Sequence, residues 1–191
     1  MLELVVRSPC QGGPKGTRLG QVVSQGQVIA SRGEWKRTGK GVVCVCGVFD
    51  LLHPGHIRLL EQARSLGDIV VVALQSDAGV RAAAAFQGDS SGDQTPDNIP
   101  RPVTPASERA EILAALAAAD YVVEFDEPSP AGFLARLLPD TLVEGAEPGA
   151  PAASDSEGEA LRRVGCRLVR IPLEPGYSTS RLIQRIAGLG A

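Results

Sequence analysis

The sequence has 191 residues, of which 43% are hydrophobic, and a formal net charge of −3. This composition favours one folded domain and argues against a disordered chain. No run of lysines and arginines could follow a nucleic-acid backbone, and no stretch reaches the roughly 18 apolar residues of a membrane span. Residues 1–9 do not resemble a signal peptide, because Glu3 and Arg7 interrupt their apolar run. We therefore expect a cytoplasmic protein that binds neither nucleic acid nor membranes.

The first part of the chain is expected to be a tail followed by a helix. Residues 1–20 are rich in glycine and proline, a composition that favours a loop. Residues 21–37 are predicted to form a helix that ends near Gly39, with Trp35 as its anchor. We therefore divide the chain into residues 1–35, a tail with a possible helix, and residues 36–191, the main domain.

From residue 42 on, short apolar segments alternate with segments of helical spacing. Loops rich in glycine, proline and serine are expected at 87–100, where we predict a mobile lid or insert, and at 147–156. The alternation predicts an α/β fold, a Rossmann-like doubly wound five-stranded parallel sheet with helices on both faces. Strands are expected at 42–46, 69–74, 121–125, 141–143 and 167–171, and helices at 54–66, 77–85, 107–119, 129–138, 157–164 and 180–187.

The four cysteines are expected to be reduced thiols. Cys44 and Cys46 lie two residues apart on a predicted strand, a spacing that rarely allows disulfide geometry. Cys10 and Cys166 complete no zinc-binding spacing with them. This use of cysteine is typical of proteins from a reducing compartment.

The candidate chemistry lies directly after the first long strand. Residues 47–56 (GVFDLLHPGH) contain both histidines of the chain at the start of a predicted helix. Ligands of parallel sheets bind at the carboxyl ends of strands, near the point where the strand order reverses. Gly47 lets the backbone approach a ligand, Pro54 suits the first helical position, and Gly55 leaves the helix N-terminus open to a flat base or a phosphate. His53 and His56 would then stabilise charge that develops on a phosphate.

Two other interpretations of the histidines stay open. A pair spaced three apart could bind a metal ion, although no third protein ligand is evident. The segment could also be an ordinary helix start. The ordered pattern of a buried strand, a glycine, Phe-Asp and His-x-Gly-His favours a catalytic interpretation.

The segment resembles the signature of the cytidylyltransferase-like nucleotidylyltransferases. Within that superfamily it is most similar to the adenylyltransferase domain of ADP-heptose synthases, which act on D-glycero-β-D-manno-heptose 1-phosphate. The resemblance extends over about residues 36–187. Four further segments support it in the same order: residues 74–77, residues 101–103 with Pro105 and Arg109, residues 119–123 before 125–127, and residues 176–180.

The resemblance implies roles for individual residues. The implied catalytic residues are His53, His56 and Arg109. The implied nucleotide-binding residues are Gly47, Val48, Phe49, Gly55, Gly145, Ser178, Thr179 and Ser180. The implied acceptor-binding residues are Asp50, Ser76, Asp77 and Arg81. A structural salt bridge remains the alternative for Asp50 and Arg109, as does a plain helix cap for the Ser-Thr-Ser turn.

Three positions depart from the family pattern near the expected site. Glu144 stands where the family has a lysine, and the Asp-aromatic pair that should follow is missing. After the second strand, Arg81 could replace the first family lysine, but Ala84 stands for the second. Cys46 occupies the middle of the family's T-N-G segment. These changes raise the question of substrate identity and of catalytic competence.

The resemblance implies a nucleotidylyltransferase. It would transfer a nucleoside monophosphate, AMP in preference to CMP, from a triphosphate bound with Mg²⁺ to a phosphorylated small molecule, and release pyrophosphate. The expected acceptor is a sugar 1-phosphate of the heptose type. The alternatives are glycerol 3-phosphate, a phosphoethanolamine-like molecule or a phosphonate, or a nucleotide-binding protein without turnover. A homodimer is also implied.

Overall fold

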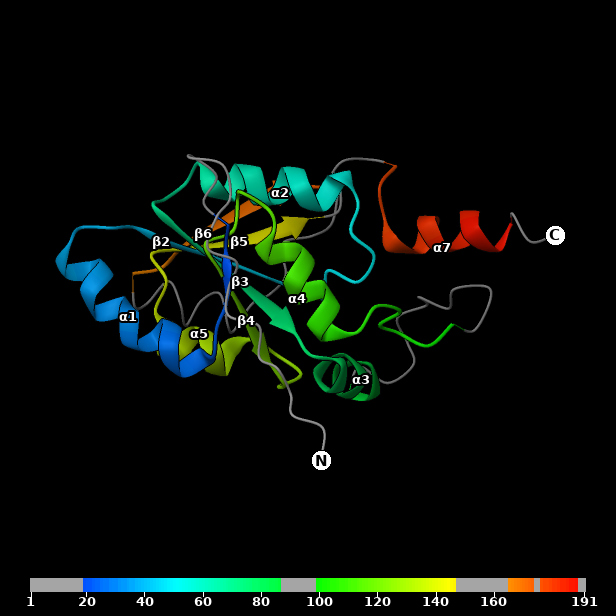
Figure 1. Cartoon of the computed structure of the whole chain (residues 1–191), viewed down its shortest axis with the longest axis horizontal. Coiled ribbons are helices and arrows are strands. Elements are labelled where there is room, and N and C mark those ends of the chain that lie inside the picture. The colour runs from blue at the N-terminus through cyan, green and yellow to red at the C-terminus, as the bar shows by residue number, and fades with distance from the viewer. Residues whose placement is uncertain (1–18, 87–98, 147–164, 174–175, 189–191) are drawn as a thin grey trace, which may run out of the picture.

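The computed structural model describes residues 19–86, 99–146, 165–173 and 176–188 (Figure 1). The predictions for residues 1–18, 87–98, 147–156 and 157–164 lie outside these residues. No helix within the described ranges is long and apolar enough to cross a membrane. The elements are β1 (Gln21–Val22), α1 (Gln25–Arg37), β2 (Val42–Gly47), α2 (Pro54–Arg64), β3 (Ile69–Gln75), α3 (Asp77–Phe86), α4 (Ala106–Ala114), β4 (Tyr121–Phe125), α5 (Ala131–Leu137), β5 (Thr141–Ala146), β6 (Arg167–Pro172) and α7 (Thr179–Ala187).

The strands form one parallel sheet in the order β1-β4-β3-β2-β5-β6. From β2 the chain moves outward through β3 to β4, and it then crosses back to add β5 and β6 on the other side of β2. The strand order therefore reverses between β2 and β5, where such sheets bind their ligands. The doubly wound parallel sheet and its five predicted strands are confirmed.

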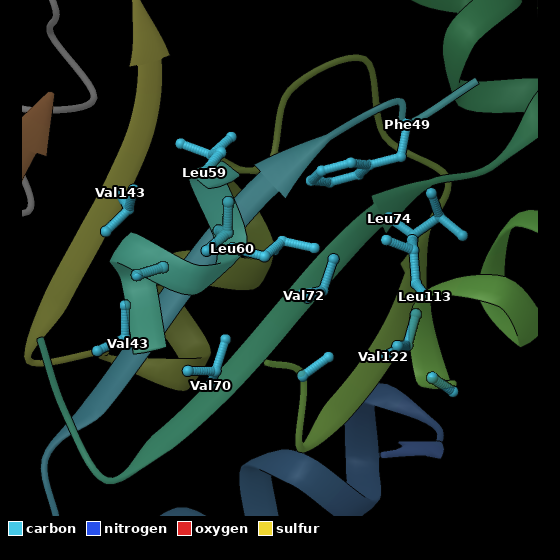
Figure 2. Close-up of a cluster of buried hydrophobic side chains, with 14 of the residues drawn as sticks. Val43, Phe49, Leu59, Leu60, Val70, Val72, Leu74, Leu113, Val122 and Val143 are labelled. Atoms are coloured by element: carbon cyan, nitrogen blue, oxygen red, sulfur yellow. The ribbon is translucent and has the colours of Figure 1, made fainter. Parts of the chain in front are cut away.

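Both faces of the sheet are buried, as the continuous apolar strands predict. Successive residues of β2 point to opposite faces, so that Val43 and Val45 join one core cluster while Val42 and Cys44 join the other. Helices α2 and α4 cover the first face, and Figure 2 shows their leucines Leu59, Leu60 and Leu113 against the strand valines. Helices α1 and α5 cover the second face and lie side by side in Figure 1.

The segment before the first long strand belongs to the same layers. The sheet has a sixth strand, β1, which pairs with β4 and was not predicted, because two residues show no periodicity. Helix α1 begins at Gln25 after a capping box formed by Ser24 and Gln27, and it runs across the domain boundary predicted at residue 35. Trp35 anchors it against Tyr121, with ring centroids 5.2 Å apart.

Helix α4 ends at Ala114, five residues before the predicted end at Ala119. The carbonyl of Ala114 accepts a hydrogen bond from the backbone N–H of Gly20 at 2.8 Å. A side chain at Gly20 could not fit there, because its Cβ would lie 2.5 Å from the carbonyl oxygen of Ala119. The end of the helix is therefore set by the N-terminal segment, which helical spacing alone does not reveal.

Candidate active site

The loop after β2 folds back on itself so that an aromatic ring covers the strand end. Phe49 adopts a left-handed backbone conformation with φ of 49°, which is unusual for a residue with a side chain. Its buried ring lies over Gly47, where an added Cβ would come 2.9 Å from Phe49 Cε2. Gly47 is thus required for the ring to pack here. Such conformations concentrate at functional sites.

The two histidines stack at the start of α2. His53 is the N-cap residue, but its side chain makes no capping hydrogen bond, and Pro54 occupies the first turn. The rings of His53 and His56 lie 3.8 Å apart between centroids with an interplanar angle of 15°. A Cβ at Gly55 would come 3.0 Å from His53 Nδ1. Gly55 therefore makes room for the imidazole of His53, and not directly for a ligand as the sequence suggested.

Both imidazoles are neutral at pH 7. Burial lowers the pKa of His53, and burial together with the nearby charge of His53 lowers the pKa of His56 to about 4. Among the described residues, the buried Nδ1 atoms of both rings have no hydrogen-bond partner. Buried polar atoms usually find partners, so two orphaned ring nitrogens at one place indicate a site that a polar ligand completes.

A cavity of about 710 Å³ opens beside His53 and runs along the first turns of α7. Two arginines one helical turn apart line it, and none of the lining residues is acidic. Helix α7 lies on the side toward which the arrows of β3 and β5 point in Figure 1, which is the carboxyl end of the sheet. The lining residues are His53, Pro54, Gly176, Tyr177, Ser178, Arg181, Leu182, Gln184 and Arg185.

The start of α7 adds a second source of positive potential. Ser178 is its N-cap, with its side chain accepting a hydrogen bond from the backbone N–H of Arg181, and Thr179 is the first helical residue. The Ser-Thr-Ser turn thus does cap the helix, and Ser178 lines the cavity as well. Helix N-termini attract anions through their free N–H groups and dipole. Together with Arg181 and Arg185, this end of α7 forms an anion pocket.

Asp50 fastens the loop after β2 to the Arg-Pro-Val segment and, through it, to α7. Its Oδ1 accepts hydrogen bonds from the backbone N–H groups of Val103 and Thr104 at 2.8 and 3.0 Å. Its Oδ2 pairs with Arg101 Nη1 at 3.0 Å, and Arg101 Nη2 donates to Ser180 Oγ at 3.3 Å. The carboxylate is almost fully buried, so these internal contacts define its place. These contacts support the alternative role predicted for Asp50, a structural salt bridge.

Arg109 lies inside the protein and not in the cavity. Its side chain is completely buried. Its Nε donates to the carbonyl of Thr104 at 2.8 Å, and its Nη1 donates to the carbonyls of Val48 and Gln75. Its Nη2 pairs with Asp77 Oδ1 at 2.6 Å.

These contacts correct the predicted catalytic role of Arg109. A guanidinium whose donors are turned to three carbonyls and a carboxylate cannot reach a phosphate without leaving all of them. Arg109 instead ties the ends of β2 and β3 to α3 and α4, which gives it a positioning role. The same contact holds one carboxylate oxygen of Asp77, whose role in binding the acceptor stays a prediction.

The remaining predicted residues lie around this centre. Ser76 accepts a hydrogen bond from Gly79 N–H at 3.0 Å and thereby caps α3, so its hydroxyl does not face the cavity, and Arg81 is exposed on α3. Gly145 is the last residue but one of β5 and lies beside Leu173, whose Cδ2 would lie 2.8 Å from an added Cβ. Glu144 pairs with Arg170 on β6 at 3.3 Å and does not line the cavity.

Three cysteines lie in or against the core cluster on the second face of the sheet. Cys44, Cys46 and Cys166 are free thiols, and the sulfur atoms of the first two lie 3.9 Å apart. The hydrogen bond with Cys46, burial and the neighbouring thiols raise the pKa of Cys44, so it stays protonated at neutral pH. Cys10 lies outside the described residues.

Comparison with known proteins finds a family model and relatives that match this chain. The family model described as cytidylyltransferase-like matches residues 44–87, which contain most of β2, the histidines and β3. The bifunctional protein HldE of Koribacter versatilis is 39% identical over 166 residues, which are 86% of this chain and 31% of that protein. That of Citrifermentans bemidjiense is 43% identical over 148 residues, 78% of this chain and 27% of that protein. The segment that carries the histidines is thus similar to the cytidylyltransferase-like family, and the chain spans about a third of the length of these relatives.

Solved structures support the fold. A lipopolysaccharide core biosynthesis protein from Thermoplasma volcanium GSS1 superimposes with a TM-score of 0.52 at 21% identity, covering 71% of this chain and 98% of that one. A pantoate-β-alanine ligase from Francisella tularensis gives a TM-score of 0.53 at 14% identity, covering 86% and 73%. At these identities the likeness concerns the arrangement of sheet and helices.

Sequence reasoning missed three residues that line this site. Tyr177 lines the cavity beside His53, and Arg181 and Arg185 line it from α7. The spacing of the two arginines, four residues apart behind a helix cap, was visible in the sequence and predicts a shared helix face. The position of Tyr177 depends on a turn at Gly176, with φ of 97°, that no periodicity encodes.

Proposed function

We propose that this protein is a nucleotidyltransferase that transfers AMP from ATP to a sugar 1-phosphate of the heptose type and releases pyrophosphate. The observation that carries the proposal is the stacked pair of neutral histidines at the edge of a cavity lined by two arginines and a helix N-terminus. That arrangement suits a polyphosphate whose reacting phosphorus lies at the imidazoles. The relatives named HldE support the choice of a heptose phosphate, and the likeness to the adenylyltransferase domain supports ATP over CTP.

The proposed reaction is one in-line displacement. An oxygen of the acceptor phosphate forms a bond to the α-phosphorus, the bond from that phosphorus to the bridging oxygen breaks, and pyrophosphate leaves with the electron pair. The N–H groups of His53 and His56 donate to the α-phosphate as its charge grows, and Arg181 and Arg185 hold the outgoing phosphates. No covalent intermediate with the enzyme forms. Loss of one such donor typically slows an enzyme about 10²- to 10³-fold.

Magnesium is proposed to enter with the nucleotide. In the described ranges, no group of three His, Cys, Asp or Glu side chains could hold a metal ion. The carboxylates nearest the loop, Asp50 and Asp77, are bound to Arg101 and Arg109. These residues do not form a protein-held magnesium site. Mg²⁺ commonly keeps several waters and binds mainly through substrate phosphates, which fits this donor set.

The alternative of a nucleotide-binding protein without turnover rested on the three departures from the family pattern, of which the one at Glu144 carried the electrostatic argument. In the structure this carboxylate is matched by Arg170 and stands outside the cavity, so it does not repel a phosphate in the proposed site. The alternative therefore loses its main physical argument.

The proposal is tested by measuring pyrophosphate release for ATP and CTP with each candidate acceptor: heptose 1-phosphate, glycerol 3-phosphate and phosphoethanolamine. We expect the highest kcat/KM for ATP with heptose 1-phosphate. A preference for CTP with glycerol 3-phosphate would replace the proposed substrates by the alternative ones. Nucleotide binding without pyrophosphate release for every pair would contradict the proposed reaction.

A further inference from the structure

An unbroken series of ring contacts runs from the loop after β2 to the surface. The ring of Phe49 lies 5.2 Å from that of His56, which stacks on His53 at 3.8 Å. The ring of His53 in turn faces Tyr177 at 6.4 Å with an interplanar angle of 26°. The guanidinium carbon of Arg58 lies over the ring of Tyr177, 5.4 Å from its centroid. Elements 120 residues apart in the chain thus meet through four rings.

We infer that Tyr177 is a positioning residue that holds the imidazole of His53, and through it His56, in the orientation required for transfer. This inference rests on the proposed function for its catalytic consequence. The contact itself is independent of that function. Phe49 closes one end of the histidine stack from the β2 loop, and Tyr177 closes the other from the turn before α7.

The physical reason is that, among the described residues, no hydrogen bond to another side chain holds the ring of His53. It makes no capping hydrogen bond, and its Nδ1 has no partner among the described residues. Ring packing therefore decides its rotamer. Aromatic pairs with centroids 4.5–7 Å apart attract each other, and the cation of Arg58 over the tyrosine ring adds to its ordering.

The position of Tyr177 also links the histidines to the anion pocket. The next residue, Ser178, caps α7, so the ring and the helix N-terminus belong to one rigid turn. A ligand that binds the start of α7 would then fix the same turn that holds His53. The charged groups that face the stack are the cations Arg58, from α2, and Arg181 and Arg185, from α7.

The chain allows a direct test, because His53 and His56 are its only two histidines. In an NMR titration of the full chain, the ring signals of these two residues therefore report on the stack without overlap from other histidines. In Tyr177→Leu we expect both pKa values to rise toward the ordinary histidine value, because His53 gains water and the stack loosens. Tyr177→Phe keeps the ring and should leave both titrations unchanged. Tyr121→Leu, which removes the same side chain from the pair with Trp35 at the amino end of β4, is the matched control and should also leave them unchanged.

Enzyme kinetics provide a second test of the role of Tyr177. With the substrates of the proposed reaction, Tyr177→Leu should lower kcat about 2- to 10-fold, the range for loss of one aromatic contact, and Tyr177→Phe should restore it. A raised KM with unchanged kcat and unchanged histidine titrations would show that Tyr177 contacts the ligand directly, and would overturn the inference. Unchanged titrations in a folded Tyr177→Leu would overturn it as well. If the wild type showed no turnover at all, the proposed function would fail while the titration still decided the role of Tyr177.

Discussion

At the scale of single residues, the site depends on side chains that are buried without their usual partners. His53 and His56 give up contact with water at their Nδ1 atoms and stay neutral. Neutral, stacked imidazoles can lie 3.8 Å apart, whereas two imidazolium rings at that distance would repel. The negative charge of a bound phosphate would favour the protonated form of the histidines, so phosphate binding would raise their pKa values.

This neutrality makes stability depend on pH. The pKa of His56 is about 4 in the folded protein and near 6.5 when the chain is unfolded. Between these values the unfolded chain binds protons that the folded chain does not, so acid favours unfolding. We expect the contribution of His56 to stability to be complete above pH 6.5 and to fall as the pH drops toward 4. Urea unfolding at several pH values should give a flatter profile for His56→Asn than for the wild type, and parallel profiles would contradict this.

Arg109 supports the site from inside. Arg109→Ala would leave three carbonyls without their donor and would remove the partner of Asp77. Breaking a buried ion pair in this way typically costs about 3–5 kcal/mol. We expect a loss of that size in the free energy of unfolding, measured by urea denaturation. Arg136→Ala, at an exposed arginine of α5, is the control and should cost less than about 1 kcal/mol. A variant of Arg109 with unchanged stability and a raised nucleotide KM would return this residue to the binding site.

At the scale of elements, the sequence patterns predicted the strands and helices that pack into the core. They missed the features that depend on hydrogen bonds between distant segments. Apolar runs identified the strands of the sheet because both faces are covered. The helix segments were recognised by spacing, but the ends of α4 and the existence of β1 depend on hydrogen bonds between distant segments. The histidine segment was found because it follows directly after a strand. The structural role of Arg109 was not found, because a sequence does not show in which direction a guanidinium group points.

The pair of Glu144 and Arg170 joins β5 to β6 at facing register positions. Glu144→Lys would place two cations opposite each other, where like charges destabilise a sheet. Because both side chains are partly exposed, we expect a loss of up to about 1 kcal/mol, measured as a lower Tm. The double variant Glu144→Lys with Arg170→Glu should recover most of it. An increase in nucleotide affinity in Glu144→Lys would instead place this residue in the binding site.

At the scale of the whole molecule, the strand order builds the site from distant parts of the chain. The reversal between β2 and β5 leaves the carboxyl end of β2 open, and α7 returns to that end with the anion pocket. The sequence predicted a parallel sheet and a site at its carboxyl edge. It could not predict that Tyr177 and two arginines of α7 would meet His53, since that contact depends on how the last helix docks.

The most direct test of this account is the turnover of His53→Ala and His56→Ala together with their affinity for nucleotide. Pyrophosphate release is followed with ATP and heptose 1-phosphate, and the nucleotide Kd is measured by calorimetry in the same preparations. We predict that each variant loses about 10²-fold or more in kcat, as expected when a donor to the developing charge is removed, while its Kd and Tm change little. Wild-type turnover in both variants would contradict the assignment of the stacked histidines as the reacting centre.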